Sequence, residues 1–267
     1  MALLTYDRQG SGSTLVWLHG FTQTRESAHR FRTILAGSHE LASTDLPGHG
    51  RAHAVRATLN ETADLVASSL PAYPVALGGY SLGARVALHV ALRHPGRLSA
   101  LILLGASRGI EDDQQRRERI DRDEALAERI EAIGTPRFLD EWLAQPMFAS
   151  LPPDPRERRA RSADAAGLAS SLRLCGTGTQ EFLGPRLWSL VVPTLCLAGE
   201  LDEKFLAEAR AITQGAPQAT FEVVAGAHHA AHLENPDGCA RLVSAFLSLT
   251  GPKEGHHERT THEQLGQ

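Results

Sequence analysis

The sequence lacks the features that mark membrane, secreted and metal-binding proteins. Its only cysteines lie far apart, without the paired spacing of a zinc site: Cys175, Cys196 and Cys239. We interpret them as reduced thiols and expect neither a disulfide nor a metal site. No apolar run approaches the length that crosses a bilayer. The N-terminal segment MALLTYDRQGSG lacks the positive start and apolar stretch of a signal peptide. We therefore expect a cytoplasmic protein without a membrane partner.

The sequence also lacks an excess of either charge. The formal net charge is −4 over 267 residues, which gives no general affinity for nucleic acid. The hydrophobic share of 42% and the charged share of 22% are typical of a soluble globular enzyme. The length suits one large α/β domain with an insertion. We expect a monomer or small homo-oligomer that does not bind nucleic acid.

Short apolar runs alternate with helical patterns along most of the chain. Runs this apolar are typical of strands buried on both faces of a parallel sheet. The predicted strands and the loops that follow them lie at 14–20, 40–50, 73–81, 98–107, 191–202 and 219–229. One helix begins directly after the serine of GYSLG and ends at Pro95 and Gly96. The alternation predicts a doubly wound, mostly parallel sheet.

One long stretch breaks this alternation. Residues 107–187 contain only helical patterns, which predicts a helical cap inserted between two strands. In an open α/β sheet such a cap covers the carboxyl ends of the strands, where ligands bind. The predicted core is therefore 1–106 with 188–250, and the predicted cap is 107–187. The polar stretch 251–267 has no periodicity, so we predict a disordered tail whose histidines are solvated rather than metal ligands.

The motif GYSLG places Ser81 in a candidate nucleophile elbow. In such an elbow a strand turns sharply into a helix, and the turn exposes the serine hydroxyl. Flanking glycines are needed because side chains there would collide with neighbouring backbone. A five-residue match also occurs by chance, but here a buried strand precedes it and an amphipathic helix follows it. We therefore predict that Ser81 is catalytic.

An elbow serine requires a base, and that base requires an orienting acid. The usual chain order is serine, acid, histidine. Asp202 follows the fifth predicted strand, and its place in this order favours it as the acid, although it could also serve as a helix N-cap. After the sixth strand, His228, His229 and His232 are all candidates for the base, and the pattern alone does not choose among them.

An oxyanion hole requires two backbone N–H groups aimed at one point. Leu82 follows the candidate nucleophile and supplies one N–H group. The loop LHGFTQ after the first predicted inner strand supplies the other, and Phe21 is the expected donor. The turn at His19 and Gly20 could instead serve only to end the strand.

The order of these elements resembles the α/β-hydrolase superfamily over about residues 3 to 250. A narrower resemblance is to the 2-succinyl-6-hydroxy-2,4-cyclohexadiene-1-carboxylate synthases of menaquinone biosynthesis. It is carried by LHGFT, DLPGHG, GYSLGAR, FLDEWLAQPMFASL, GTGTQ, LAGELDEKF and HLENP. Members of that family are lyases. They remove a proton from 2-succinyl-5-enolpyruvyl-6-hydroxy-3-cyclohexene-1-carboxylate and expel pyruvate, with no metal or organic cofactor.

The resemblance implies a role for each site residue. It selects His229 as the base that primes Ser81 for proton abstraction. It implies that Arg85 binds a carboxylate of a small polycarboxylate substrate, and guanidinium suits that task because of its fork geometry. A surface salt bridge is the alternative for Arg85. Arg119, four residues before Asp123, is a second implied carboxylate clamp, with a solvated surface arginine as its alternative.

The resemblance also implies that Tyr80 and Trp142 shape the pocket. The sequence departs from the family pattern at His228, which stands where a glycine usually precedes the catalytic histidine. The segment FTQTRESAHRF lacks the glycine and tryptophan often found after the oxyanion loop. Two other functions stay open: a serine hydrolase acting through an acyl-enzyme, on an ester or a C–C bond, and a non-enzymatic receptor on the same fold.

Overall fold

The computed structural model describes residues 3–250, so the predicted tail 251–267 lies outside the described residues. One seven-stranded sheet has the order β1-β3-β2-β4-β5-β6-β7. Its strands are β1 (Asp7–Gln9), β2 (Thr14–Leu18), β3 (Glu40–Thr44), β4 (Val75–Tyr80), β5 (Leu98–Leu104), β6 (Thr194–Gly199) and β7 (Ala219–Val224). Only β1 is antiparallel to its neighbour. All six predicted strands are confirmed, and β1 is an addition at the edge.

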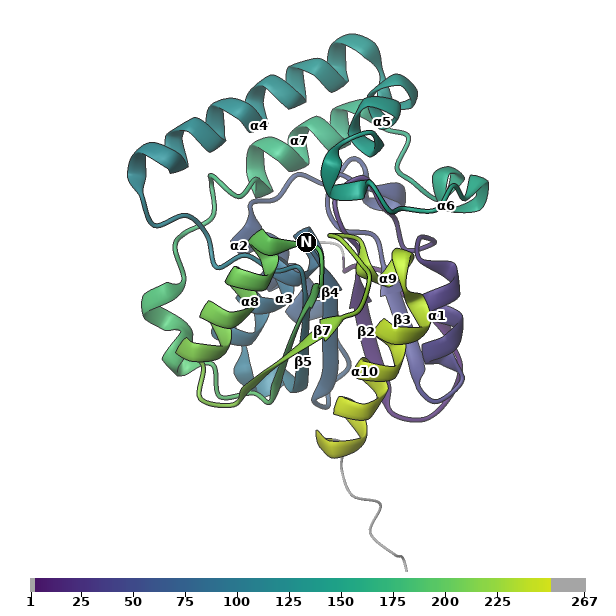
Figure 1. Cartoon of the computed structure of the whole chain (residues 1–267), viewed down its shortest axis with the longest axis vertical. Helices are drawn as coiled ribbons and strands as arrows, with labels where there is room; N and C mark the ends of the chain where they lie inside the picture. Colours follow the sequence, from purple (N-terminus) through teal and green to yellow (C-terminus); the bar gives the residue numbers. More distant parts are fainter. Residues whose placement is uncertain (1–2, 251–267) are drawn as a thin grey trace, which may run out of the picture.

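Helices cover both faces of the sheet (Figure 1). One face packs against α2 (Leu59–Ser69), α3 (Leu82–Arg93) and α8 (Glu203–Gly215). The other packs against α1 (His29–Ala36), α9 (Ala231–Glu234) and α10 (Pro236–Thr250). Every residue of β2, β4 and β6 is buried, which explains the continuous apolar runs in the sequence. The predicted doubly wound fold is confirmed.

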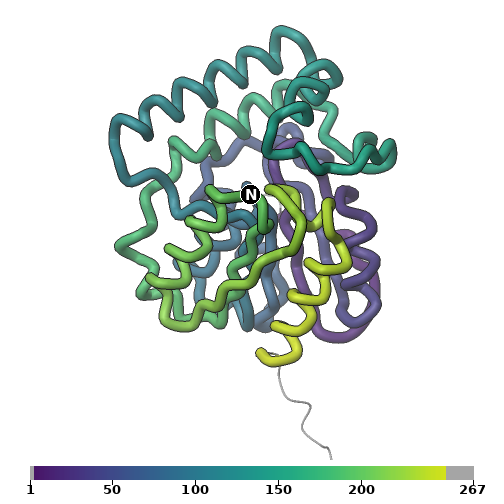
Figure 2. The backbone as a smooth tube through the Cα atoms, in the orientation of Figure 1, coloured from purple at the N-terminus to yellow at the C-terminus, as the bar shows by residue number. Residues whose placement is uncertain are grey.

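Between β5 and β6 the chain builds a helical layer above the sheet. Its helices are α4 (Asp113–Ile133), α5 (Thr135–Leu143), α6 (Pro155–Arg159) and α7 (Ala165–Cys175). Two short 3-10 turns lie in the same stretch, η3 (Pro146–Phe148) and η4 (Gly184–Ser189). Two others, η1 (Gly50–Ala52) and η2 (Pro95–Arg97), precede β5. Figure 2 shows this layer lying across one end of the sheet. The described chain has no strand between β5 and β6, whereas the exact cap limits, 107 and 187, stay a prediction.

The cap has a small apolar core of its own. Ala127 and Ile130 of α4 pack with Phe138 of α5 and with Leu168 and Leu172 of α7. The outer face of α4 is strongly charged, which fits a helix that covers the core and faces water. The cap forms a layer over the strand ends, where the candidate site residues gather.

Within residues 3–250, no helix is both long and apolar enough to cross a membrane.

Candidate active site

Ser81 lies in a strained turn between β4 and α3. Its backbone has φ 52° and ψ −107°, a positive-φ conformation that is uncommon for a residue with a side chain. A Cβ atom on Gly79 would lie 2.4 Å from the carbonyl carbon of Gly83. A Cβ atom on Gly83 would lie 2.3 Å from the carbonyl oxygen of Leu18. Only glycine fits at both positions, which is the physical content of the elbow motif.

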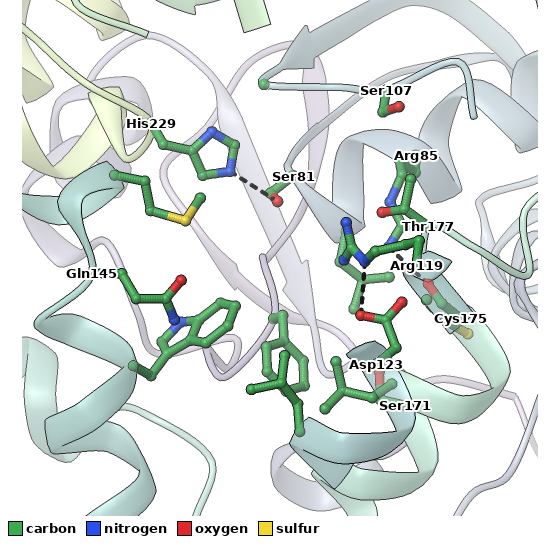
Figure 3. A pocket seen from close by; sticks show the side chains of 18 of the residues that line it. Ser81, Arg85, Ser107, Arg119, Asp123, Gln145, Ser171, Cys175, Thr177 and His229 are labelled. Carbon is green, nitrogen blue, oxygen red and sulfur yellow. Dashed lines mark hydrogen bonds and ion pairs between the residues drawn. The ribbon is translucent and has the colours of Figure 1, made fainter. Parts of the chain in front are cut away.

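The structure brings Ser81, His229 and Asp202 into one hydrogen-bonded chain. The Nε2 atom of His229 lies 3.1 Å from Ser81 Oγ, and its Nδ1 atom lies 2.9 Å from Asp202 Oδ2. Figure 3 shows the imidazole pointing at the serine hydroxyl. Since a carboxylate only accepts, Nδ1 carries the proton and Nε2 is left to accept the proton of Ser81. This is the arrangement that activates a serine.

Asp202 serves two structural purposes at once. Its Oδ1 atom accepts a hydrogen bond from the backbone N–H of Phe205 and so caps α8, while Oδ2 holds His229. The ring of Phe205 lies 4.2 Å from the imidazole, centroid to centroid. The N-cap hydrogen bond fixes the carboxylate of Asp202, and the ring of Phe205 limits rotation of the imidazole. The N-cap alternative raised by the sequence is therefore compatible with a role beside His229.

The other two candidate histidines lie away from the serine hydroxyl. His228 is partly exposed and contacts Ser150 and Glu234 on the outer side of the loop. His232 is 1% exposed and packs its ring 4.3 Å from that of Tyr80. Burial lowers the pKa of His232 to about 3, so its ring is neutral. Neither histidine has a hydrogen bond to Ser81, which singles out His229.

The two expected oxyanion donors flank the serine. Leu82 is the first residue of α3, so its N–H has no partner inside the helix. The backbone N–H of Phe21 likewise donates to no described residue. Both residues line the same cavity as Ser81. The turn that contains Phe21 is closed by a hydrogen bond from the N–H of Gln23 to the carbonyl oxygen of Gly20, 3.1 Å long.

A cavity of about 370 Å³ opens above Ser81, between the strand ends and the cap. Its basic lining residues come from both layers: Arg85 from α3, Arg119 and Arg122 from α4, and Lys204 from α8. Asp123 is the acidic residue that lines it. The excess of positive charge suits a ligand with several carboxylates and is unusual for a pocket that accepts a neutral ester.

Arg85 is a buried cation with no carboxylate partner among residues 3–250. Its side chain, one helical turn beyond Ser81, donates from Nη2 to the carbonyl oxygen of Cys175 at 2.7 Å and from Nη1 to Gln180 Oε1 at 3.2 Å. The residue is 8% exposed, and burial lowers the pKa of its guanidinium to about 10. The alternative of a surface salt bridge for Arg85 is wrong, because the guanidinium is buried and lines the cavity.

Arg119 and Asp123 form an ion pair on the cavity wall. The distance between Arg119 Nε and Asp123 Oδ1 is 2.9 Å. Asp123 is 2% exposed, and its Oδ2 atom has no hydrogen-bond partner in the described structure. Figure 3 shows this pair beside Arg85. Arg119 is therefore not a solvated surface arginine. Its Nε is paired with Asp123, and the residue lines the cavity.

Aromatic rings form the opposite wall. Trp142 stacks on Phe138 with centroids 5.8 Å apart and meets Phe21 edge-on at 5.3 Å. The indole N–H of Trp142 is buried and donates to no described residue, while other atoms of the side chain line the cavity. Tyr80 also lines the cavity, and burial raises the pKa of its phenol. Both residues line the cavity, and their contact with a substrate stays a prediction.

Comparison with known proteins places this site in a family. The sequence model of the alpha/beta hydrolase family matches residues 15–242. The chain belongs to the alpha/beta hydrolase family. The solved structure of MenH from S. aureus superposes on 94% of this chain and all of that chain, with a TM-score of 0.85 and 29% identity. A thermophilic esterase from Thermogutta terrifontis, 23% identical with a TM-score of 0.77, shares the fold over 93% of this chain and 94% of its own.

Sequence relatives of this alpha/beta hydrolase cover nearly its whole length. A Bacillus subtilis protein is 36% identical over 89% of this chain and 91% of its own length. A Yersinia pseudotuberculosis protein is 36% identical over 90% of this chain and 89% of its own length. The latter is named 2-succinyl-6-hydroxy-2,4-cyclohexadiene-1-carboxylate synthase. The similarity spans the core and the cap alike.

The sequence interpretation missed several cavity residues of this alpha/beta hydrolase. Arg122 and Gln145 come from the cap and Lys204 from the start of α8. Arg122 stands in a helix dense in both charge signs, so no periodic signal marks its inward direction. Lys204 lies within the segment GELDEKF, where its position directly after the aspartate loop was the available signal. Among residues 3–250, no His, Cys, Asp or Glu cluster of metal-binding size occurs.

We predict that Ser81→Ala, Asp202→Asn and His229→Ala each lower turnover by about a thousandfold or more, because the three act as a unit. His228→Ala, a change at the neighbouring histidine, is the matched control and retains most of the turnover. The measurement is kcat on purified variants whose melting temperatures match the parent. Near-parental kcat in His229→Ala, with an inactive His228→Ala, would contradict the choice of histidine.

Proposed function

We propose that this alpha/beta hydrolase is a 2-succinyl-6-hydroxy-2,4-cyclohexadiene-1-carboxylate synthase, a carbon–oxygen lyase of menaquinone biosynthesis. The observation that carries the proposal is the buried guanidinium of Arg85, which opens onto the cavity above Ser81 without a carboxylate partner in the described chain. A neutral ester has no group to neutralise that charge. The substrate of this reaction has carboxylates on the ring, the succinyl group and the enolpyruvyl group.

The names of substrate and product define the bond changes. A 3-cyclohexene with its enolpyruvyl oxygen on ring carbon 5 becomes a 2,4-diene, so the hydrogen on ring carbon 2 is lost. That carbon also bears the succinyl carbonyl, which makes its hydrogen acidic. The electron pair of the broken C–H bond passes into the carbonyl as an enolate and returns as the new double bonds when the bond from carbon 5 to oxygen breaks. Pyruvate leaves after the enolpyruvate takes up a proton.

The triad supplies the base for this reaction. His229 Nε2 accepts the proton of Ser81, and Ser81 Oγ in turn removes the proton from ring carbon 2. Asp202 stabilises the imidazolium that forms, because its carboxylate is already bonded to Nδ1. The imidazolium then provides the proton that converts the departing enolpyruvate to pyruvate. The N–H groups of Phe21 and Leu82 stabilise the enolate oxygen of the succinyl group.

The basic residues of the cavity bind the carboxylates. Arg85 holds one carboxylate from its place one turn beyond the serine on α3. Arg119, kept in place by Asp123, offers its free terminal nitrogens to a second. Lys204 and Arg122 add positive charge without an ion-pair partner among residues 3–250 and complete the counter-charge. Trp142 and Tyr80 shape the cavity around the ligand, and Tyr80 lies next to Ser81.

The remaining assignments rest on the same function. Residues 107–187 act as the cap of a core made of 1–106 and 188–250. The enzyme acts in the cytoplasm as a monomer or small homo-oligomer, without cofactor, nucleic acid or membrane partner. The direct test is an ultraviolet assay of diene formation with pyruvate measured in parallel. Equal amounts of diene and pyruvate support the lyase, and neither product with the authentic substrate would exclude it.

A serine hydrolase is the second candidate, because the same hydrogen-bonded triad could instead direct Ser81 at a carbonyl carbon. We predict that a serine-directed phosphonate labels Ser81, while turnover of the carboxylated substrate leaves no adduct on it. The elbow and oxyanion donors activate the hydroxyl for any suitable electrophile. Intact-protein mass spectrometry measures both outcomes. A substrate-derived adduct on Ser81 during turnover would favour the hydrolase.

We predict that Arg85→Ala lowers kcat/KM for the carboxylated substrate by about thirtyfold or more. Losing one partner of a buried charged pair commonly costs about 2–5 kcal/mol, and the bound carboxylate is the counter-ion of Arg85. Hydrolysis of a neutral aryl acetate changes much less, because it offers Arg85 no anion. Arg85→Lys recovers only part of the loss, since an ammonium lacks the planar fork. Steady-state kinetics with both substrates measure the difference.

The control for this experiment is the melting temperature of each Arg85 variant. An equal loss of both activities in folded Arg85→Ala would mean that the residue supports α3 rather than binding the substrate. No loss of either activity would remove the charge argument for the lyase.

A further inference from the structure

One buried residue, Gln23, holds the turn that carries one oxyanion donor. The Oε1 atom of Gln23 accepts the N–H of Gly20 at 2.9 Å, and the N–H of Gln23 donates to the carbonyl oxygen of Gly20 at 3.1 Å. Phe21 lies inside this closed turn. Gln23 is 1% exposed and does not line the cavity, so it touches the turn but not a ligand. The side chain of Gln23 therefore holds Gly20, directly before Phe21, and its backbone N–H closes the turn.

The NH₂ group of the Gln23 side chain contacts the segment that follows His229. Gln23 Nε2 lies 3.3 Å from His232 Nε2, three residues beyond His229. Because Oε1 is taken by an N–H group, the amide presents its NH₂ to the imidazole, and His232 accepts. Burial keeps His232 neutral, with its pKa lowered to about 3, so the ring can accept at working pH. The contact joins the loop after β2 to α9.

The ring of His232 is fixed by its surroundings. It packs 4.3 Å from Tyr80, 5.8 Å from Phe31 and 6.3 Å from Trp17, measured between ring centroids. Its Nδ1 atom is buried without a partner in the described structure. Because Nε2 accepts from Gln23, Nδ1 carries the proton of the neutral ring, and this buried N–H has no described partner. Such a group costs folding free energy, which the contact with Gln23 partly offsets.

The turn itself requires an external hold. Thr22, next to Phe21, has φ 67°, which is unfavourable for a residue branched at Cβ. From the cap side, Arg161 Nη1 donates to Thr22 Oγ1 at 2.6 Å and the N–H of Ser162 to the Thr22 carbonyl at 2.8 Å. Gln23 holds the other side of the turn. A loop under such strain relaxes when one of its holds is removed.

We propose that Gln23 and His232 are positioning residues, which aim the Phe21 N–H at the oxyanion by tying its turn to the loop of the catalytic base. The inference rests on the oxyanion role given to Phe21 in the proposed function. It extends that function, because neither residue touches the substrate and the pair acts through the backbone of the turn. Loss of the pair should therefore weaken the transition state more than the bound substrate.

The first test is Gln23→Met, which keeps the side-chain length and removes both polar contacts. We expect kcat to fall by about ten- to a hundredfold with KM within about threefold, since a donor misplaced by about 1 Å can cost a factor of that size. Phosphonate labelling of Ser81 slows by a similar factor, because it uses the same donors and no carboxylate. Gln180→Met is the matched contrast: this buried amide contacts Arg85, so its loss acts mainly on the carboxylated substrate.

The second test examines the partner. His232→Gln places an amide oxygen near the position of Nε2 and should retain more kcat than His232→Leu, which has no acceptor. The double variant Gln23→Met with His232→Leu should have about the same kcat as whichever single variant is the less active, because the pair acts as one unit. This series also decides the matter if Gln23→Met fails to fold, since the two His232 variants can be compared at matched melting temperature.

Two outcomes would overturn the inference. One is a folded Gln23→Met that keeps kcat and labelling within about threefold of the parent. The other is a pair of folded His232 variants with equal kcat. The proposed function fails separately: if the parent makes no diene but Gln23→Met still slows the labelling of Ser81, the positioning role stands and the lyase does not. If the parent makes diene and labelling is unaffected by Gln23→Met, the positioning role falls and the lyase stands.

Discussion

The close approach of α3 to β2 and β4 is the constraint on which the site depends. Gly83 sits where any side chain would collide with the carbonyl oxygen of Leu18, and Gly79 sits against Gly83 itself. This contact presses the start of α3 onto the strand ends and forces Ser81 into its positive-φ turn. The Leu82 N–H and the serine hydroxyl consequently face the same space. The strain is local, because the buried sheet on either side holds the turn in place.

The same helix carries the residue that separates this site from an ordinary esterase pocket. Arg85 lies four residues past Ser81, so the Cα atoms of the two residues are about 6 Å apart along the axis of one rigid helix. Burying a guanidinium with only two neutral oxygen acceptors leaves part of its desolvation cost uncompensated. In the proposed function a carboxylate of the substrate supplies the missing partner. Binding of an anionic substrate therefore relieves a cost that the folded protein bears alone, which is the usual relation between stability and function at such sites.

The sequence could predict the features that depend on local chemistry and chain order. The six parallel strands were predictable because each carries a run of apolar or β-forming residues, even β7, which lies at an edge of the sheet and is largely accessible. The antiparallel edge strand β1, DRQ, has no such pattern. Ser81 was predictable because its glycines reflect steric contacts. The inward direction of Arg122 was not, since it depends on how α4 packs across α7. Residue type alone did not separate the three histidines after β7. His232 in particular is enclosed by aromatic rings, and its hydrogen bond to Gln23 joins residues far apart in the sequence, so no local pattern could predict it.

One triad can serve two chemistries because both begin with the same proton transfer from Ser81 to His229. The next step depends on which substrate atom is presented to the serine oxygen. A carbonyl carbon at that point leads to an acyl-enzyme, and an acidic C–H leads to elimination. In the proposed function the carboxylate anchors decide this presentation: Arg85, one helical turn from Ser81, holds one anionic group and the cap cations hold the others. With the succinyl carbonyl oxygen bound by the oxyanion donors, the hydrogen on the adjacent ring carbon comes within reach of Ser81 Oγ. The selectivity for elimination thus arises from charge placement around an unchanged catalytic centre.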